Sequence, residues 1–158
     1  MPTEPDFLAD NSASNAELRA LVGRLTDADL ARDLGEGWTV SAMLAHLALF
    51  DFRAAALLDR WRQSGVVAAS PLDADLLNAA TSHLFLAIPA HRAAELTLAA
   101  ADAADQRVAA IDANFLARID AAGRPITLNR SAHRREHIEQ IQSAIGRPAA
   151  APRTGPAA

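Results

Sequence analysis

The sequence contains no cysteine and no tyrosine, and aromatic residues make up only 4% of its 158 positions. The lack of cysteine excludes disulfides, thiolate zinc sites and a cysteine nucleophile, so histidine, aspartate or glutamate would have to hold any metal. Runs of valine, isoleucine, threonine and tyrosine, which are typical of strands, are missing as well. Alanine dominates the apolar fraction instead, and this favours helices that pack closely.

The charge and the apolar pattern narrow the classes of partner. A net charge of −4 gives no electrostatic case for nucleic-acid binding. The first residues lack the basic and apolar segments of a signal peptide, and no apolar run approaches the ~18 residues that cross a bilayer. We therefore expect a cytoplasmic protein that binds neither nucleic acid nor membrane.

The helical periodicity of the apolar residues predicts one all-α domain, a four-helix bundle over residues 14–146. Residues 1–13 are expected to form a flexible N-terminus, and the Pro- and Ala-rich residues 147–158 a disordered tail. The segment from Ser14 to Glu17 fits a capping box, which would begin the first helix at Ser14.

The second predicted helix is long and has clear end signals. Thr39 fits its N-cap, Trp38 would pack onto Met43 as a hydrophobic staple, and Gly65 marks its C-terminal stop. The link to the next long helix, residues 64–88, has room to cross the bundle. A strict up-down-up-down order of the helices is therefore not required.

The remaining two long helices are placed by proline and glycine. The third follows Pro89 and would overshoot its neighbours if it ran unbroken to Gly123, so we expect a break near residues 112–114. The last helix is expected from about Asn129 to Ile145, where glycine and proline follow.

Three histidines carry the functional prediction. His133 and His137 lie four residues apart in the last helix, so both imidazoles leave the same face. His46 lies among apolar residues early in the second helix. If the two helices pack side by side, the three side chains converge as metal ligands. Chance alone gives an i,i+4 histidine pair in roughly one such sequence in seven, so the spacing leaves a solvated polar face open as the alternative.

A resemblance to a known family bears on this choice. It is carried by a Trp-Thr pair ahead of the first histidine and by the paired histidines, in the segments Gly37-Trp38-Thr39-Val40, Leu44-Ala45-His46-Leu47 and His133-x-x-x-His137-x-x-Gln140-Ile141. Together these segments resemble the DinB/YfiT-like superfamily over roughly residues 14–146. The resemblance implies a metal-binding four-helix bundle with a long crossover between helices two and three, often a homodimer. It also implies that the three histidines ligate a divalent metal, usually zinc or nickel.

The superfamily includes thiol-dependent S-transferases and the N-terminal domain of mycothiol-dependent maleylpyruvate isomerase. Three histidine ligands would leave an open position at which the metal activates a thiol or a water. The resemblance favours S-transfer or isomerisation of a small electrophile with a low-molecular-weight thiol as cofactor. A metal-dependent hydrolase and a non-enzymatic, metal-braced binding or dimerisation module remain as alternatives.

Other polar residues near the paired histidines were weighed for a role. Arg134 and Arg135 are candidates for holding an anionic group of the cofactor or substrate, with surface arginines as the equal alternative. The same segment matches the H-x-x-E-H of inverted zinc peptidases, with Glu136 as general base. We favour Glu136 instead as a neighbour of the ligands or a solvated residue. His83 and His91 are expected outside the site.

Overall fold

The computed structural model describes residues 7–146, which are mostly helical, as the sequence predicts. The elements in chain order are α1 (Phe7–Arg24), α2 (Asp27–Leu30), β1 (Asp33–Gly35), β2 (Trp38–Thr39), α3 (Val40–Ser64), α4 (Ala74–Ala87), α5 (Ala90–Ala109), α6 (Ala113–Ala121) and α7 (Ser131–Ile145). The predicted disordered tail, residues 147–158, lies outside the described residues.

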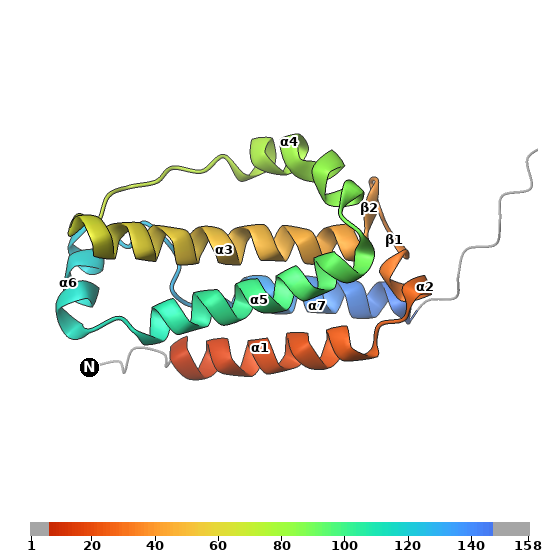
Figure 1. The fold of residues 1–158 in the computed structure, drawn as a ribbon, viewed down its shortest axis with the longest axis horizontal. Helices are drawn as coiled ribbons and strands as arrows, with labels where there is room; N and C mark the ends of the chain where they lie inside the picture. Colours follow the sequence, from red (N-terminus) through yellow and green to blue (C-terminus); the bar gives the residue numbers. More distant parts are fainter. Residues whose placement is uncertain (1–6, 147–158) are drawn as a thin grey trace, which may run out of the picture.

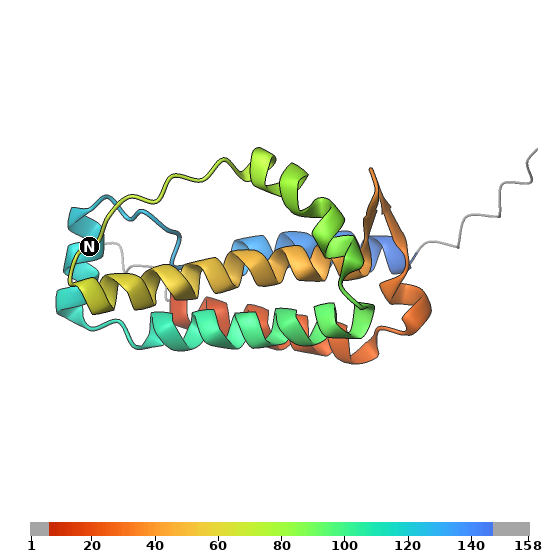
Figure 2. The same cartoon turned by 45° about the horizontal axis from the view of Figure 1, so that its top comes forward.

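Four long helices, α1, α3, α5 and α7, lie side by side along the molecule (Figures 1 and 2). The segment between α3 and α5 returns along the length of α3 and carries α4 on the outside, so α3 and α5 run in the same direction (Figure 1). α1 and α7 run the opposite way. The long link thus crosses the bundle, as its length had suggested.

The predicted end signals of α3 and the predicted break after α5 are confirmed. The Thr39 hydroxyl accepts a hydrogen bond from the amide of Ala42 at 3.2 Å. Gly65 ends α3 in the left-handed conformation, with φ 72°, which favours glycine. α5 stops at Ala109, and the carboxylate of Asp112 caps the start of α6. Local chemistry therefore sets these boundaries.

The start of α1 was predicted wrongly. The helix begins at Phe7, seven residues before Ser14, so residues 7–13 are not a flexible lead-in. The reason is a long-range contact: the Asn11 side chain donates to the carbonyl of Leu128 at 2.9 Å and accepts from the amide of Arg130 at 2.6 Å. Ser14 is buried inside the helix, where its hydroxyl donates to the carbonyl of Asn11.

The glycine-rich segment before α3 forms a small hairpin, which the strand-free prediction missed. β1 and β2 pair antiparallel, and Gly35 at the end of β1 and Gly37 in the turn both have positive φ. The hairpin leads directly into α3, and the ring of Trp38 packs against those of His46 and Phe85, with centroids 5.7 and 6.0 Å apart. These ring contacts tie the hairpin to α3 and α4, beside the histidines.

One buried arginine joins all four long helices. From α7, Nε of Arg134 donates to Asp51 on α3 at 2.9 Å, and Nη2 donates to Asp105 on α5 at 2.8 Å. Its Nη1 donates to the carbonyl of Asn11 on α1 at 3.1 Å. Burial alone would lower the pKa of Arg134, but the bonds and charges of Asp105 and Asp51 outweigh it and raise the pKa. Arg134 therefore stays charged in the core.

The longest apolar helix belongs to this core. Among residues 7–146, α3 alone has the length and composition of a membrane span, and 61% of its most apolar stretch is buried inside the bundle. The core helix of a bundle has the same composition as a span. The cytoplasmic location thus stays a prediction.

Replacing Arg134 with alanine should destabilise the fold strongly. The change leaves the buried carboxylate of Asp51 with one cation fewer, and breaking a buried ion pair costs about 3–5 kcal/mol. Urea denaturation followed by circular dichroism measures this loss. Arg135 lies next to Arg134 on α7 and forms a partly exposed ion pair with Glu17 of α1. Arg135→Ala removes this pair and should cost less than about 1 kcal/mol. Equal losses in the two variants would contradict the role of Arg134.

Candidate metal centre

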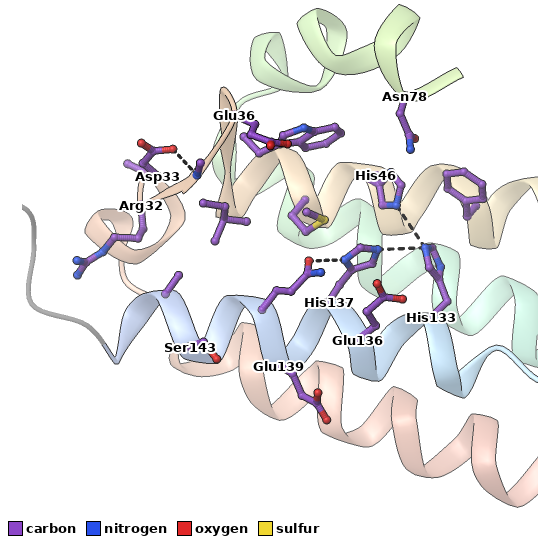
Figure 3. Close-up of a pocket in the computed structure, with 18 of the residues that line it drawn as sticks. Arg32, Asp33, Glu36, His46, Asn78, His133, Glu136, His137, Glu139 and Ser143 are labelled. Carbon is purple, nitrogen blue, oxygen red and sulfur yellow. Dashed lines mark hydrogen bonds between the residues drawn. The ribbon is translucent and has the colours of Figure 1, made fainter. Parts of the chain in front are cut away.

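The structure brings the three predicted histidines together (Figure 3). Nε2 of His133 lies 3.3 Å from Nε2 of His46 and 3.2 Å from Nε2 of His137. One ring nitrogen from each residue lies within 4.8 Å of the others. The predicted convergence is confirmed, and the group could hold a metal ion.

The positions of the helices explain this convergence. His133 and His137 lie one turn apart on α7, and His46 lies on the facing side of α3. The ring of Phe50, one turn beyond His46, contacts the rings of both His46 and His133, with centroids 4.8 and 5.2 Å away. Packed aromatic rings thus restrict how the imidazoles can turn.

The nitrogen separations are compatible with metal ligation. In a tetrahedral site with Zn–N bonds of about 2.0–2.1 Å, the ligand nitrogens lie about 3.3 Å apart. Both measured separations are close to this value. Nε2 of His133 faces two other nitrogens, yet it has either one proton or one lone pair to offer. A shared cation between three lone pairs resolves this conflict.

An outer contact sets the orientation of the His137 ring. Nδ1 of His137 lies 2.8 Å from Oε1 of Gln140, an oxygen that only accepts, so Nδ1 carries the proton and Nε2 the lone pair. Asn78 points from α4 toward the histidines (Figure 3). Its Oδ1 and Nδ1 of His46 are both buried without a partner of normal hydrogen-bond geometry. Asn78 is nonetheless close enough to act on the pKa of His46, which it raises against the larger effect of burial.

The surroundings keep two of the imidazoles neutral. Burial, followed by the charge of His137, lowers the pKa of His46 to about 4. Burial, followed by the charges of His137 and His46 and of two nearby arginines, lowers the pKa of His133 to about 3. Near pH 7 both rings are therefore in the neutral form that ligates a metal.

An open groove leads to the histidines. Its walls come from α2, the hairpin, α3, α4 and α7, and its polar side chains are Arg32, Asp33, Glu36, His46, Asn78, Arg130, His133, Glu136, His137, Glu139, Gln140 and Ser143. Figure 3 shows Glu136 beside His133 and His137, and the hairpin residues at the far end. A small molecule can thus reach the histidines, with the carboxylate of Glu136 close to them.

The structure places neither of the two candidate arginines in the groove. Arg134 is fully buried in the ion-pair network described above, and it does not line the groove. Arg135 forms an ion pair with Glu17 of α1 at 3.0 Å and does not line the groove either. Arg134 occupies the same stripe as the buried Ile138 and Ile141, and this spacing was the available signal for its burial.

Other predicted placements agree with the structure. His83 is exposed on α4, and His91 forms an exposed pair with Asp27. Neither belongs to the group of ring nitrogens at the site. Arg130 also lines the groove and was not among the predicted site residues. It lies three residues before His133, on the helix face that His133 and His137 share.

In comparisons with known proteins, no family model, no curated protein and no solved structure matches this chain. Function must therefore be inferred from the site itself.

Without metal, the protein should become less stable as the pH falls below about 6.5. In the unfolded chain the histidines take up protons near pH ~6.5, whereas the folded chain keeps His46 neutral to about 4 and His133 to about 3. In this window the unfolded state binds more protons, so the free energy of unfolding falls with falling pH. Urea midpoints at pH 7 and pH 5 in a chelator measure the effect.

A double variant tests the assignment of this acid sensitivity. His46→Gln with His133→Gln removes both titrating groups, so its midpoint should fall less between pH 7 and pH 5 than that of the native chain. An unchanged pH dependence would place the acid sensitivity on other residues.

Proposed function

We propose that this protein is a DinB-like, divalent-metal-dependent enzyme that transfers or isomerises a small electrophile with the help of a low-molecular-weight thiol. His46, His133 and His137 are the proposed ligands of a zinc or nickel ion. The observation that carries the proposal is the pair of Nε2 separations, 3.3 and 3.2 Å, at the end of an open groove. The parallel course of α3 and α5 supports the DinB-like assignment, because that family has a crossover at this link.

The number of ligands supports a reactive site over a bracing one. Structural zinc sites are normally closed by four protein ligands, whereas catalytic sites keep one position open. Within residues 7–146 the ligand group consists of three histidines, and the groove gives access to it. A divalent metal held there would lower the pKa of a thiol or water bound to it into the neutral range.

Glu136 is the proposed proton acceptor. It lies between the two α7 ligands in the sequence, is exposed and lines the groove (Figure 3). Its carboxylate can take the proton that a thiol releases on becoming a thiolate. Trp38 and Phe50 also line the groove, and their rings contact that of His46.

The same carboxylate favours a second candidate function. If water, in place of a thiol, loses its proton to Glu136, the site is that of a hydrolase acting on a small substrate. Two turnover assays distinguish the reactions. One offers a thiol together with an electrophile, and the other offers an ester without a thiol.

A homodimer is also part of the proposal. Several apolar side chains on the outer side of α4 are exposed, with Leu76 and Leu84 the most so at 66% and 64%. Covering them in a second copy would remove apolar surface from water. Light scattering on the purified protein measures its molecular mass in solution, and the mass of two chains would support the homodimer.

Protein purified without an affinity tag should bind about one divalent ion per chain. Because the three histidines act together, His46→Ala should lower the affinity for Zn²⁺ at least about tenfold. Elemental analysis and a competition titration with a chromogenic chelator measure both quantities. His91→Ala removes an exposed histidine and should leave the affinity unchanged. Equal affinity in His46→Ala and the native chain would remove His46 from the site.

The metal should be needed for turnover and not for folding. Four long helices with a leucine and isoleucine core fold without it, although a metal at a hundredfold excess over Kd adds about 2.7 kcal/mol of stability. Glu136→Gln should keep the metal and lose turnover with glutathione, mycothiol or bacillithiol and a chromogenic electrophile. If the chelated protein unfolds outright and no metal supports thiol or hydrolytic turnover, the metal only braces the bundle.

A further inference from the structure

Arg130 places a positive charge on the groove wall next to the histidines, in addition to that of the proposed metal. Arg130 is the residue at which α7 begins, three positions before His133, and the two side chains share one helix face. Both line the groove together with Phe50. The Arg130 side chain is only 11% exposed, so it faces the groove from a largely buried position.

The guanidinium of Arg130 is held in place from behind. Its Nε donates to the carboxylate of Asp51 at 2.9 Å, and its Nη1 donates to the carbonyl of Thr127 at 3.4 Å. Its Nη2 has no hydrogen-bond partner within residues 7–146, and it is not sealed from solvent either. A fixed cation with a free donor on a groove wall is the arrangement that binds a carboxylate.

The proposed metal makes this end of the groove the more positive one. Asp51 and Asp105 balance the charges of Arg130 and Arg134, so the metal would supply the excess positive charge. Two of the carboxylates that line the groove, Asp33 and Glu36, lie on the hairpin at the opposite end (Figure 3). Glu136, the nearest carboxylate on α7, faces the histidines, where the proposed metal would offset its charge.

We propose that Arg130 and the metal position together form a two-point site for a small thiol that carries a carboxylate. The inference rests on the proposed function, since the thiol is bound at the metal. Arg130 anchors the carboxylate, and this fixes the direction in which the thiolate presents its lone pairs to an electrophile in the groove. Thiols that carry a neutral group in place of the carboxylate bind less tightly, because Nη2 of Arg130 then gains no charged partner.

The test uses protein loaded with Co²⁺, whose absorption spectrum changes when a thiolate binds the metal. The probes are 3-mercaptopropionate and its neutral isostere 3-mercaptopropionamide, which differ only in the group that would meet Arg130. Native protein should bind the carboxylate form at least about tenfold more tightly, as expected for a charge-assisted hydrogen bond. Equal affinity for the two probes overturns the proposal without the need for any variant.

Variants then locate the preference. Arg130→Gln should reduce it to within about twofold, and Arg130→Lys should keep part of it, because the charge remains without the fork of donors. Arg135→Gln is the matched control, since it removes a cation from the same helix outside the groove and should keep the full preference. A full preference in Arg130→Gln, with Co²⁺ content and helicity unchanged, contradicts the proposal. Failure of the native chain to bind Co²⁺ would instead contradict the metal centre.

Discussion

The bundle depends on the ion pairs of one buried arginine. Arg134 contacts α1, α3 and α5 from α7, and no other single side chain named above reaches all of them. A guanidinium has donors in fixed directions, so satisfying Asp51 and Asp105 together allows α7 only one rotation and one height relative to its neighbours. Apolar packing alone tolerates small shifts between helices, whereas a buried charge without its partner does not. Arg134 therefore supplies much of the specificity of the packing.

The same ion pairs place the candidate metal centre. Arg134 follows His133 directly, and Asp51 lies five residues after His46 on α3. Once the Arg134–Asp51 pair fixes α7 against α3, the face of α7 that carries His133 and His137 must meet His46. The stripe of Arg134, Ile138 and Ile141 enters the core, and the neighbouring stripe faces the groove. One short segment of α7 thus contributes to both packing and ligation.

Several predictions from local sequence signals are confirmed, whereas the start of α1 and the burial of Arg134 depend on long-range partners and were missed. The i,i+4 histidines, the Thr39 cap and the Gly65 stop are read from neighbours in the chain, and the structure has them. The seven-residue extension of α1 depends on a bond from Asn11 to a loop more than a hundred residues away. The burial of Arg134 was missed as well, and its partners lie 83 and 29 residues away. The apolar stripe of the last helix indicates that Arg134 is buried, but it does not indicate which carboxylates pair with it.

This division between packing and ligation argues for a working metal over a bracing one. The leucines and isoleucines of the core and the Arg134 pairs hold the helices together independently of the imidazoles. The histidines themselves are a local cost in the metal-free chain, because burial lowers the pKa values of His46 and His133 and their Nδ1 atoms are buried without a hydrogen-bond partner. The ion pairs and the apolar core stabilise the fold enough to tolerate the unfavourable burial of these histidines beside the groove. A bound cation would offset part of this cost, and the proposed site would then keep one coordination position open for chemistry.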